Sequence, residues 1–357
     1  MARLRTDFLV HGKPMLRKTI LLGAVLFLAG CASAPDTQDT NSAPTLQEQR
    51  VRTLLTALAH DSMEGRRAGS PGAVRAAHFI AERMQEIGLV AAGDSGFHQR
   101  IQMARVEQNG RRRMVLLPNA AALDSIPVAD RDFDANVIGM IRGSDPALRE
   151  EAVVVGAHFD HIGIIAAVDG DSIANGADDD ASGVVAVLEI ARALRAGPAP
   201  KRTVIFVAFA GEEVGGTGSK KYLSQPVVPL AQTVAQFQIE MIGRPDSLAG
   251  GPGRTWLTGY ERSTMGGMLA AAGIAIVQDP RPDQRFFMRS DNYAFARVGI
   301  PAHTLSSFNL HTDYHRVGDE VERIDFAHMT AVIGEAIRAV RILTDGPRPE
   351  WLPGMRP

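Results

Sequence analysis

The sequence predicts a three-layer α/β domain with a mainly parallel central sheet. Short apolar runs alternate with helical segments through the second half of the 357-residue chain, which is typical of this architecture. The runs are continuously apolar rather than alternating, as expected for strands that are covered on both faces. They span residues 137–141, 152–157, 203–210 and 235–242.

Four helices are expected to accompany these strands. An amphipathic pattern predicts the first over residues 46–59. The second begins at a Ser70 cap, with proline in its first turn, and stops at Gly88, where a C-terminal glycine belongs. Helices over 182–195 and 325–343 each place apolar residues on one face.

The rest of the chain carries weaker signals. Between the second helix and Asp134 only residues 114–117 suggest a strand, at an edge of the sheet. Glu189, on the third helix, is expected to be solvated. The Pro-rich tail, residues 346–357, is expected to be loose.

Composition limits the class of function. With 45% hydrophobic and 22% charged residues, the chain can bury one large core or two modest ones. A formal net charge of -2 with the two signs interspersed gives no support to nucleic-acid binding. Oligomeric state is not determined by the sequence.

The N-terminus has the features of an export signal. Charged residues follow Met15, residues 19–27 are almost wholly apolar, and the run is too short to span a membrane comfortably. The ending Leu28-Ala-Gly-Cys31 resembles a bacterial lipobox, which implies a signal peptide over 1–30 and a lipid anchor on Cys31. A plain membrane anchor or a cytosolic apolar helix is the alternative.

That resemblance also implies a location. Ala32 resembles the signal for sorting to the outer membrane, so we expect an exported protein of the bacterial cell envelope, facing the periplasm. Residues 31–46 comprise the lipidated cysteine and a polar, Pro-bearing tether. Cys31 is the only cysteine, so the folded part has no disulfide.

Polar side chains cluster where the predicted strands end. In an open α/β sheet the loops after parallel strands converge on one crevice, so these residues are expected to face one pocket. Imidazoles and carboxylates without thiolate suit a catalytic zinc with an open position for water. The clusters are His158 with Asp160, the run Asp178-Asp179-Asp180, the pair Glu212-Glu213, Glu240, and the imidazoles of loop 309–316.

This order and spacing resembles the M28 family of zinc peptidases over about residues 47–345, which would be the catalytic domain. The resemblance rests on segments 156–163, 176–183 and 211–219 and on phrases such as Ser290-Asp-Asn-Tyr293. It implies a site with two Zn²⁺ ions. His158 and Glu240 would bind one ion, Glu213 and His315 the other, and Asp179 would bridge both.

The resemblance implies roles for the neighbouring residues as well. Glu212 would be the general base, and Asp160 would receive the second ring N–H of His158. Tyr314 would donate a hydrogen bond to the developing oxyanion. A cis peptide is expected between Asp179 and Asp180.

Several histidines and acids are given other roles. His161 and His311 have no place in the family's ligand set, so a structural or pocket-lining role is expected. Asp178 and Asp180 are expected to bind turn amides or to support the site electrostatically. Many aminopeptidases of the family have aspartate where this chain has Glu240, so the fine geometry of the site and its metal preference stay open.

The resemblance implies a zinc-dependent exopeptidase acting on peptides, and most directly an aminopeptidase that activates water with metal. Three alternatives keep the same site: a carboxypeptidase, a dipeptidase and a glutaminyl-cyclase-like enzyme. A fourth is a peptide-binding relative without catalysis. Side-chain specificity and the physiological metal are not determined by the sequence.

Overall fold

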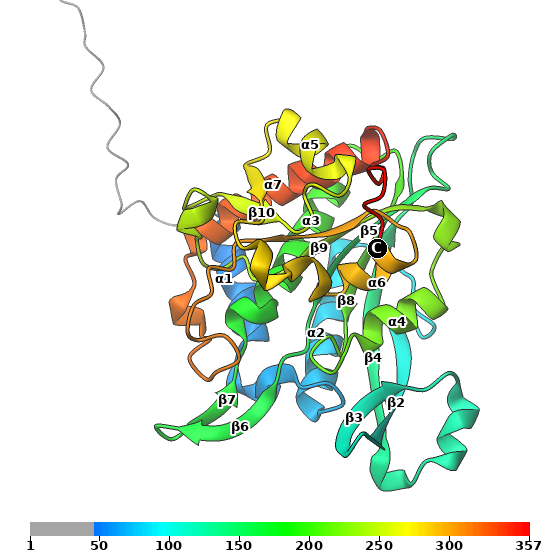
Figure 1. Ribbon diagram of the computed structural model, residues 1–357, viewed down its shortest axis with the longest axis vertical. Coiled ribbons are helices and arrows are strands. Elements are labelled where there is room, and N and C mark those ends of the chain that lie inside the picture. The colour runs from blue at the N-terminus through cyan, green and yellow to red at the C-terminus, as the bar shows by residue number, and fades with distance from the viewer. Residues whose placement is uncertain (1–45) are drawn as a thin grey trace, which may run out of the picture. The chain divides into compact units, whose positions relative to one another are not determined.

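A sheet of ten strands runs through residues 46–357, the part of the chain described by the computed structural model, and helices cover both of its faces (Figure 1). The predicted signal peptide, Cys31 and the tether up to residue 45 lie outside the described residues. Across residues 46–357 no helix is both long enough and apolar enough to cross a membrane.

The centre of the sheet is parallel and its flank beyond β8 is antiparallel. β12, β9, β5 and β8 are consecutive parallel neighbours, whereas β4, β2 and β3 continue the sheet in antiparallel pairs. The three-layer fold with a mostly parallel central sheet is therefore confirmed. In sheet order the strands are β11 (Ile276–Gln278), β10 (Thr255–Leu257), β12 (Ala302–Ser306), β9 (Thr233–Ile239), β5 (Ala152–His158), β8 (Thr203–Phe209), β4 (Arg131–Ile141), β2 (His98–Gln108) and β3 (Arg111–Leu116), with β1 (Val90–Ala91) paired to β4.

The central strands form where continuous apolar runs were expected. Every residue of β5, β8 and β9 is buried, because helices cover the sheet on both sides. The edge strand predicted at 114–117 is the end of β3. β2 was not predicted, because polar residues interrupt its apolar ones and it is held by pairing with β3 and β4.

Helices divide into two layers. α1 (Leu46–Leu58), α2 (Pro71–Ile87), α3 (Gly183–Ala196), α5 (Thr264–Ala271) and α7 (Phe326–Asp345) contribute to one buried core. α4 (Thr217–Ser224) and α6 (Asn292–Arg297) pack on the opposite face, where Tyr222 and Phe295 join a second core. The caps of α2 are as predicted: Ser70 accepts from the amide of Ala73, and Gly88 is left-handed.

Two expectations about exposure were wrong. Glu189 is 2% exposed because Arg50 of α1, 139 positions away in sequence, forms a bidentate ion pair with it. The Pro-rich tail is docked on the domain. Trp351 donates to the carbonyl of Gly299 at 2.9 Å, and the amide of Glu350 donates to the hydroxyl of Thr264 at 2.9 Å.

Candidate metal centre

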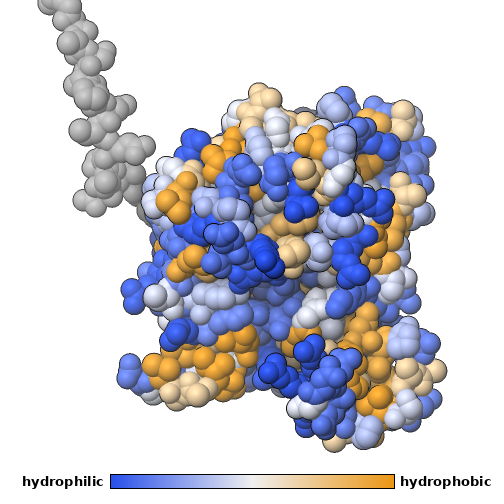
Figure 2. Space-filling model, in the orientation of Figure 1, coloured by the Kyte–Doolittle hydropathy of each residue, from blue (hydrophilic) through white to orange (hydrophobic). Residues whose placement is uncertain are grey.

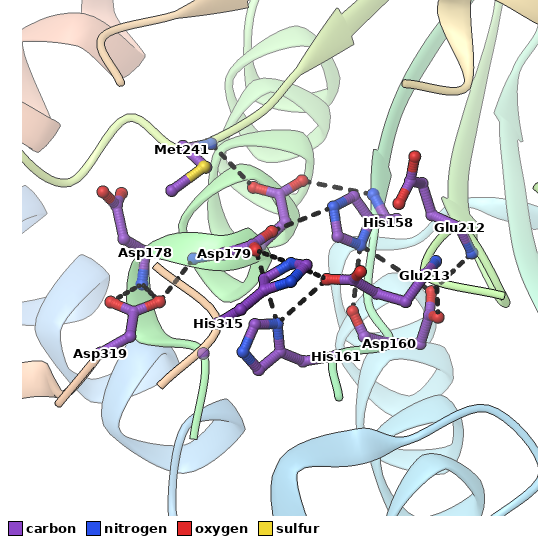
Figure 3. Close-up of polar contacts among 12 residues, drawn as sticks. His158, Asp160, His161, Asp178, Asp179, Glu212, Glu213, Met241, His315 and Asp319 are labelled. Carbon is purple, nitrogen blue, oxygen red and sulfur yellow. Dashed lines mark hydrogen bonds and ion pairs between the residues drawn. The ribbon is translucent and has the colours of Figure 1, made fainter. Parts of the chain in front are cut away.

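The carboxyl ends of three neighbouring parallel strands carry the site, as the sequence predicted. His158 is the last residue of β5, and Glu240 follows β9 directly. Glu212 and Glu213 follow the end of β8 after a short turn. Because β9, β5 and β8 are adjacent in the sheet, these side chains reach one pocket, which His315 enters from the loop after β12 (Figure 3).

The aspartate run lies in a tight turn, η4 (Ala177–Ser182), just before α3. The peptide between Asp179 and Asp180 is cis, as the family resemblance implied. Asp179 points toward His158 and His315.

The carboxylates of the two flanking aspartates accept hydrogen bonds from backbone amides and are not among the predicted metal ligands. The carboxylate of Asp180 accepts from the amides of Met241 at 3.1 Å and Gly183 at 3.0 Å, and more loosely from that of His158 at 3.3 Å. The carboxylate of Asp178 accepts from the amide of Gly243 at 2.7 Å. Asp180 therefore ties the ends of β5 and β9, which carry His158 and Glu240, to the start of α3.

Two groups of potential ligand atoms share Asp179. In the first, Nε2 of His158 lies 3.3 Å from one oxygen of Asp179 and 3.6 Å from an oxygen of Glu240. In the second, Nε2 of His315 lies 3.1 Å from the other oxygen of Asp179 and 2.9 Å from Glu213. The structure thus brings together all five predicted ligands, with Asp179 in the bridging place.

The atoms that face the centre of each group fit a metal. They are buried and have no well-formed hydrogen bond, although buried polar atoms are nearly always hydrogen-bonded. Leaving such an atom unpaired costs about 1 to 3 kcal/mol, a cost that coordination to a cation removes. These atoms include Nε2 of His158, one oxygen of Asp179, one oxygen of Glu213 and Nε2 of His315.

Opposite charges in the site shift its titrating groups. Burial lowers the pKa of His158, but contacts with Asp179 and Glu240 outweigh burial and hold that pKa well above its usual range. For the same reason the pKa of His315 is raised to about 10, against the effect of burial, by Asp179 and Glu213. The site as a whole is an anionic pocket that favours a cation.

His161 was expected to play a structural or pocket-lining role, and the structure places it among the potential ligand atoms. Its ring is fully buried, and Nδ1 lies 3.3 Å from Glu213 and 3.6 Å from Asp179, inside the second group of ligand atoms. His311 is outside both groups and contacts Asp178 at 3.2 Å. In the sequence, only its position three residues after His158 indicated that His161 would lie near the predicted ligands.

The carboxylate of Asp160 has hydrogen-bond partners other than the predicted ring N–H of His158. Nδ1 of His158 contacts the backbone carbonyl of Asp160 at 3.0 Å, while its distance to the carboxylate, 3.8 Å, is too long for a hydrogen bond. The carboxylate accepts from the amides of Glu212 at 3.0 Å and Glu213 at 3.3 Å instead. Asp160 therefore positions Glu212 and Glu213 through their backbone amides. Burial raises the pKa of Asp160 itself to about 8.

Glu212 and Tyr314 line the pocket beside the ligands. Burial raises the pKa of the Glu212 carboxyl well above its usual range, with the charge of His158 acting in the opposite direction. A carboxyl with a raised pKa suits proton transfer near neutral pH. The ring of Tyr314 stacks on that of His315 at 3.9 Å between centroids, and burial raises the pKa of its hydroxyl.

Two further buried residues, Asp319 and Arg66, support the site. Asp319 accepts from the amides of Asp178 and Asp179 at 3.0 to 3.2 Å and so holds the aspartate turn from outside. Arg66 is fully buried and donates to four backbone carbonyls, which belong to Leu58, Phe159, Asn175 and Gly176. No local pattern distinguishes Asp319 from a surface charge, since its partners are remote in sequence.

Fold and site together define a candidate metal centre built at the carboxyl edge of an α/β sheet. The model of peptidase family M28 matches residues 136–340, and the chain belongs to that family. The family implies zinc as the metal. Within this range lie all the residues of the two ligand groups.

Curated and solved relatives agree with the family. Aminopeptidase YwaD of Bacillus subtilis is 25% identical over 190 residues, which cover 46% of this chain and 41% of YwaD. The zinc aminopeptidase BSAP of Bacillus subtilis shares the fold with a TM-score of 0.60 at 14% identity, over 86% of this chain and 97% of BSAP. Glutaminyl cyclase of Porphyromonas gingivalis does so with a TM-score of 0.56 at 16% identity, over 82% and 97%.

The chain spans only part of its curated relatives. The matches cover 41 to 65% of the length of the first three.

Proposed function

We propose that the protein is a zinc-dependent aminopeptidase that holds two Zn²⁺ ions and removes N-terminal residues from peptides. The observation that carries the proposal is the pair of ligand groups joined by buried Asp179, with the unligated carboxyl of Glu212 beside them. In two-metal hydrolases the ions lie about 3.5 to 4 Å apart and share such a carboxylate.

Bound zinc would supply a water of lowered pKa and polarise the scissile carbonyl. The chain's own residues supply the proton transfers. Glu212 accepts the proton of the attacking water at a carboxylate oxygen and returns it to the leaving amine nitrogen. Asp160 holds the backbone of Glu212 so that this carboxyl faces the pocket.

Tyr314 is proposed to stabilise the oxyanion. Its ring is held against that of His315, and it lines the pocket together with Asp179 and Glu213. The raised pKa of its hydroxyl keeps it protonated, so it donates rather than accepts a hydrogen bond. Loss of one oxyanion donor costs about 3 kcal/mol in other hydrolases.

The pocket beside the ligands favours an apolar residue. Aromatic and apolar side chains form much of its wall, and the carboxylates of the site close one end. These apolar residues are Met241, Trp256, Phe286 and Phe308. A leucine or phenylalanine side chain at the substrate's N-terminus would bury its surface here, at about 25 cal/mol per Å².

The charge differs on the two sides of the proposed ligands, and this difference supports binding of the amino end of a peptide substrate in the pocket. On the pocket side lie Glu212 and Glu240, which attract a free ammonium group. On the other side of Glu213 opens a cleft, in the mainly hydrophilic hollow of Figure 2 between β2–β3 and the β6 (Gly163–Val168) and β7 (Asp171–Ala174) hairpin. Its cations are Arg67, Arg105, Arg112, Arg113 and Lys220.

This asymmetry favours an aminopeptidase over a carboxypeptidase. The N-terminal residue would enter the acidic pocket, and the rest of the peptide, which ends in a carboxylate, would leave over the cationic cleft. Arg105 and Arg112 are paired with Asp132 and Asp130 respectively, so Arg67, Arg113 and Lys220 carry most of the uncompensated charge.

Hydrolysis of leucyl and alanyl p-nitroanilides by the zinc-loaded full chain tests the proposal. We expect turnover that is faster on leucine than on alanine, lost with a chelator, restored by Zn²⁺ and absent on N-acetylated leucyl p-nitroanilide. Cleavage of N-blocked peptides with a free carboxyl end would indicate a carboxypeptidase, and cyclisation of glutaminyl substrates a cyclase. A zinc-loaded protein inert on all of them would support the non-catalytic relative.

We also propose that the protein is exported and anchored to the bacterial outer membrane through lipid on Cys31, facing the periplasm. The lipobox-like ending before Cys31 supports this. Metabolic labelling with a palmitate analogue should mark the wild type but not a Cys31→Ser variant. Equal labelling of both would exclude this anchor.

A further inference from the structure

We infer that His161 is a sixth protein ligand, which gives the two metal positions different coordination. The inference rests on the proposed metal centre and extends it. With His161, the group around Glu213 and His315 has four protein donors, whereas the group around His158 and Glu240 has three.

The state of the buried histidines identifies His161 as a ligand. Four histidines are buried among residues 46–357. His303 and His328 have both ring nitrogens within 2.6 to 2.9 Å of a hydrogen-bonding partner, as structural histidines do. His158, a ligand, has one such nitrogen and one that faces Asp179 and Glu240 unpaired. Neither nitrogen of His161 is hydrogen-bonded.

Distances around His161 match the geometry of a zinc site. Ligand atoms about 2.0 to 2.1 Å from a tetrahedral zinc lie about 3.3 Å from one another. Nδ1 of His161 is 3.3 Å from Glu213 and 3.6 Å from Asp179, and Nε2 of His315 is 2.9 and 3.1 Å from the same two carboxylates. Both imidazoles therefore face the same carboxylate pair, and Figure 3 shows their rings next to each other.

The ring of His161 is held in this place before any ion binds. Gly176, with a φ of +57°, packs directly on it, and a Cβ at that position would lie 2.6 Å from Cγ of the ring. The carbonyl of Gly176 is in turn fixed by the guanidinium of Arg66 at 2.8 Å. A ligand fixed in this way loses little conformational freedom when it binds.

Four protein donors complete a tetrahedral shell, while three leave a position open. The position with His161 is therefore expected to bind its ion more tightly and to be filled first. The open position belongs to the group of His158 and Glu240, next to Glu212 and the apolar pocket. The ion at the position with His161 would then hold the bridging Asp179. The ion in the group of His158 and Glu240 would have the open position for a further ligand.

Titration of the metal-free full chain with Zn²⁺ by calorimetry, and with Co²⁺ by visible absorption, tests the inference. For His161→Ala we expect one of the two affinities to fall more than about 100-fold, because loss of a residue that only hydrogen-bonds to a metal ligand already costs 10 to 100-fold. The other affinity should change less than threefold. His311→Ala, which removes a histidine near the aspartates but outside both groups, should leave both affinities within threefold.

The results distinguish failure of the proposed function from failure of the role given to His161. If the wild type binds no metal, the proposed function fails; if His161→Ala binds both ions as the wild type does, only the role of His161 fails. A crystal of the wild type with one equivalent of Zn²⁺ tests the same inference without a substitution. Anomalous density about 2.0 to 2.1 Å from Nδ1 of His161 is expected. Density in the group of His158 instead would overturn the preferred order of filling.

Discussion

Replacing Arg66 with methionine should destabilise the protein although Arg66 touches no ligand of the proposed metal centre. Its guanidinium is fully buried and donates at 2.7 to 2.8 Å to carbonyls in three segments: the end of α1, the turn after β5 and the segment before the aspartate turn. These contacts fix the segments that lead from His158 and to Asp179.

The magnitude follows from two opposing terms. Hydrogen bonds to a charged donor contribute about 1.5 kcal/mol or more each, so four of them contribute about 6 kcal/mol. Against this stands the cost of burying the charge. Burial lowers the pKa of Arg66 from 12.5 to about 10, although Asp319 and Asp179 oppose the shift. Such a shift corresponds to about 3 kcal/mol. The expected loss is therefore about 3 kcal/mol, similar to breaking other buried charged contacts.

Urea unfolding of the chelator-treated protein measures this loss without a contribution from bound metal. Arg67→Met is the matched control, because the neighbouring arginine is exposed and should change the free energy of unfolding by less than about 0.5 kcal/mol. Equal stability of Arg66→Met and Arg67→Met would refute the reasoning, since four buried carbonyls would then have lost their donor at no cost.

Three further predictions concern single residues. Glu212→Gln should lower kcat by about 10² to 10⁴ with zinc content unchanged, and a parallel loss of zinc would show that Glu212 is a ligand. Tyr314→Phe should lower kcat about 100-fold with KM nearly constant, whereas a change in KM alone would place Tyr314 in substrate binding. Burial lowers the pKa of His303 to about 4, so below its unfolded value of 6.5 only the unfolded chain takes up the proton. Stability should therefore fall by about 3 kcal/mol as pH drops from 6.5 to 4. His303→Asn should lose that part of the pH dependence, and identical slopes in urea unfolding of the two proteins would contradict it.

Much of the fold and most of the ligand set could be predicted because they depend on local patterns. Continuous apolar runs identify strands buried on both faces, and the chain order places His158, Glu213 and Glu240 just beyond such strands. The convergence of strand ends then brings them together whatever the loops do. The caps at Ser70 and Gly88 are local for the same reason, since their hydrogen bonds join residues a few positions apart.

The remaining features depend on which distant segments become neighbours. Glu189 is buried because Arg50 of another helix reaches it, and β2 exists because β3 and β4 pair with it. Asp160 binds two amides that follow β8, 52 and 53 positions away, and His161 meets Glu213 and His315 only after the loops close. A charged or polar residue has the same sequence signature whether solvent or a buried partner satisfies it. Tertiary packing alone determines which of the two applies, because the partner comes from another part of the chain.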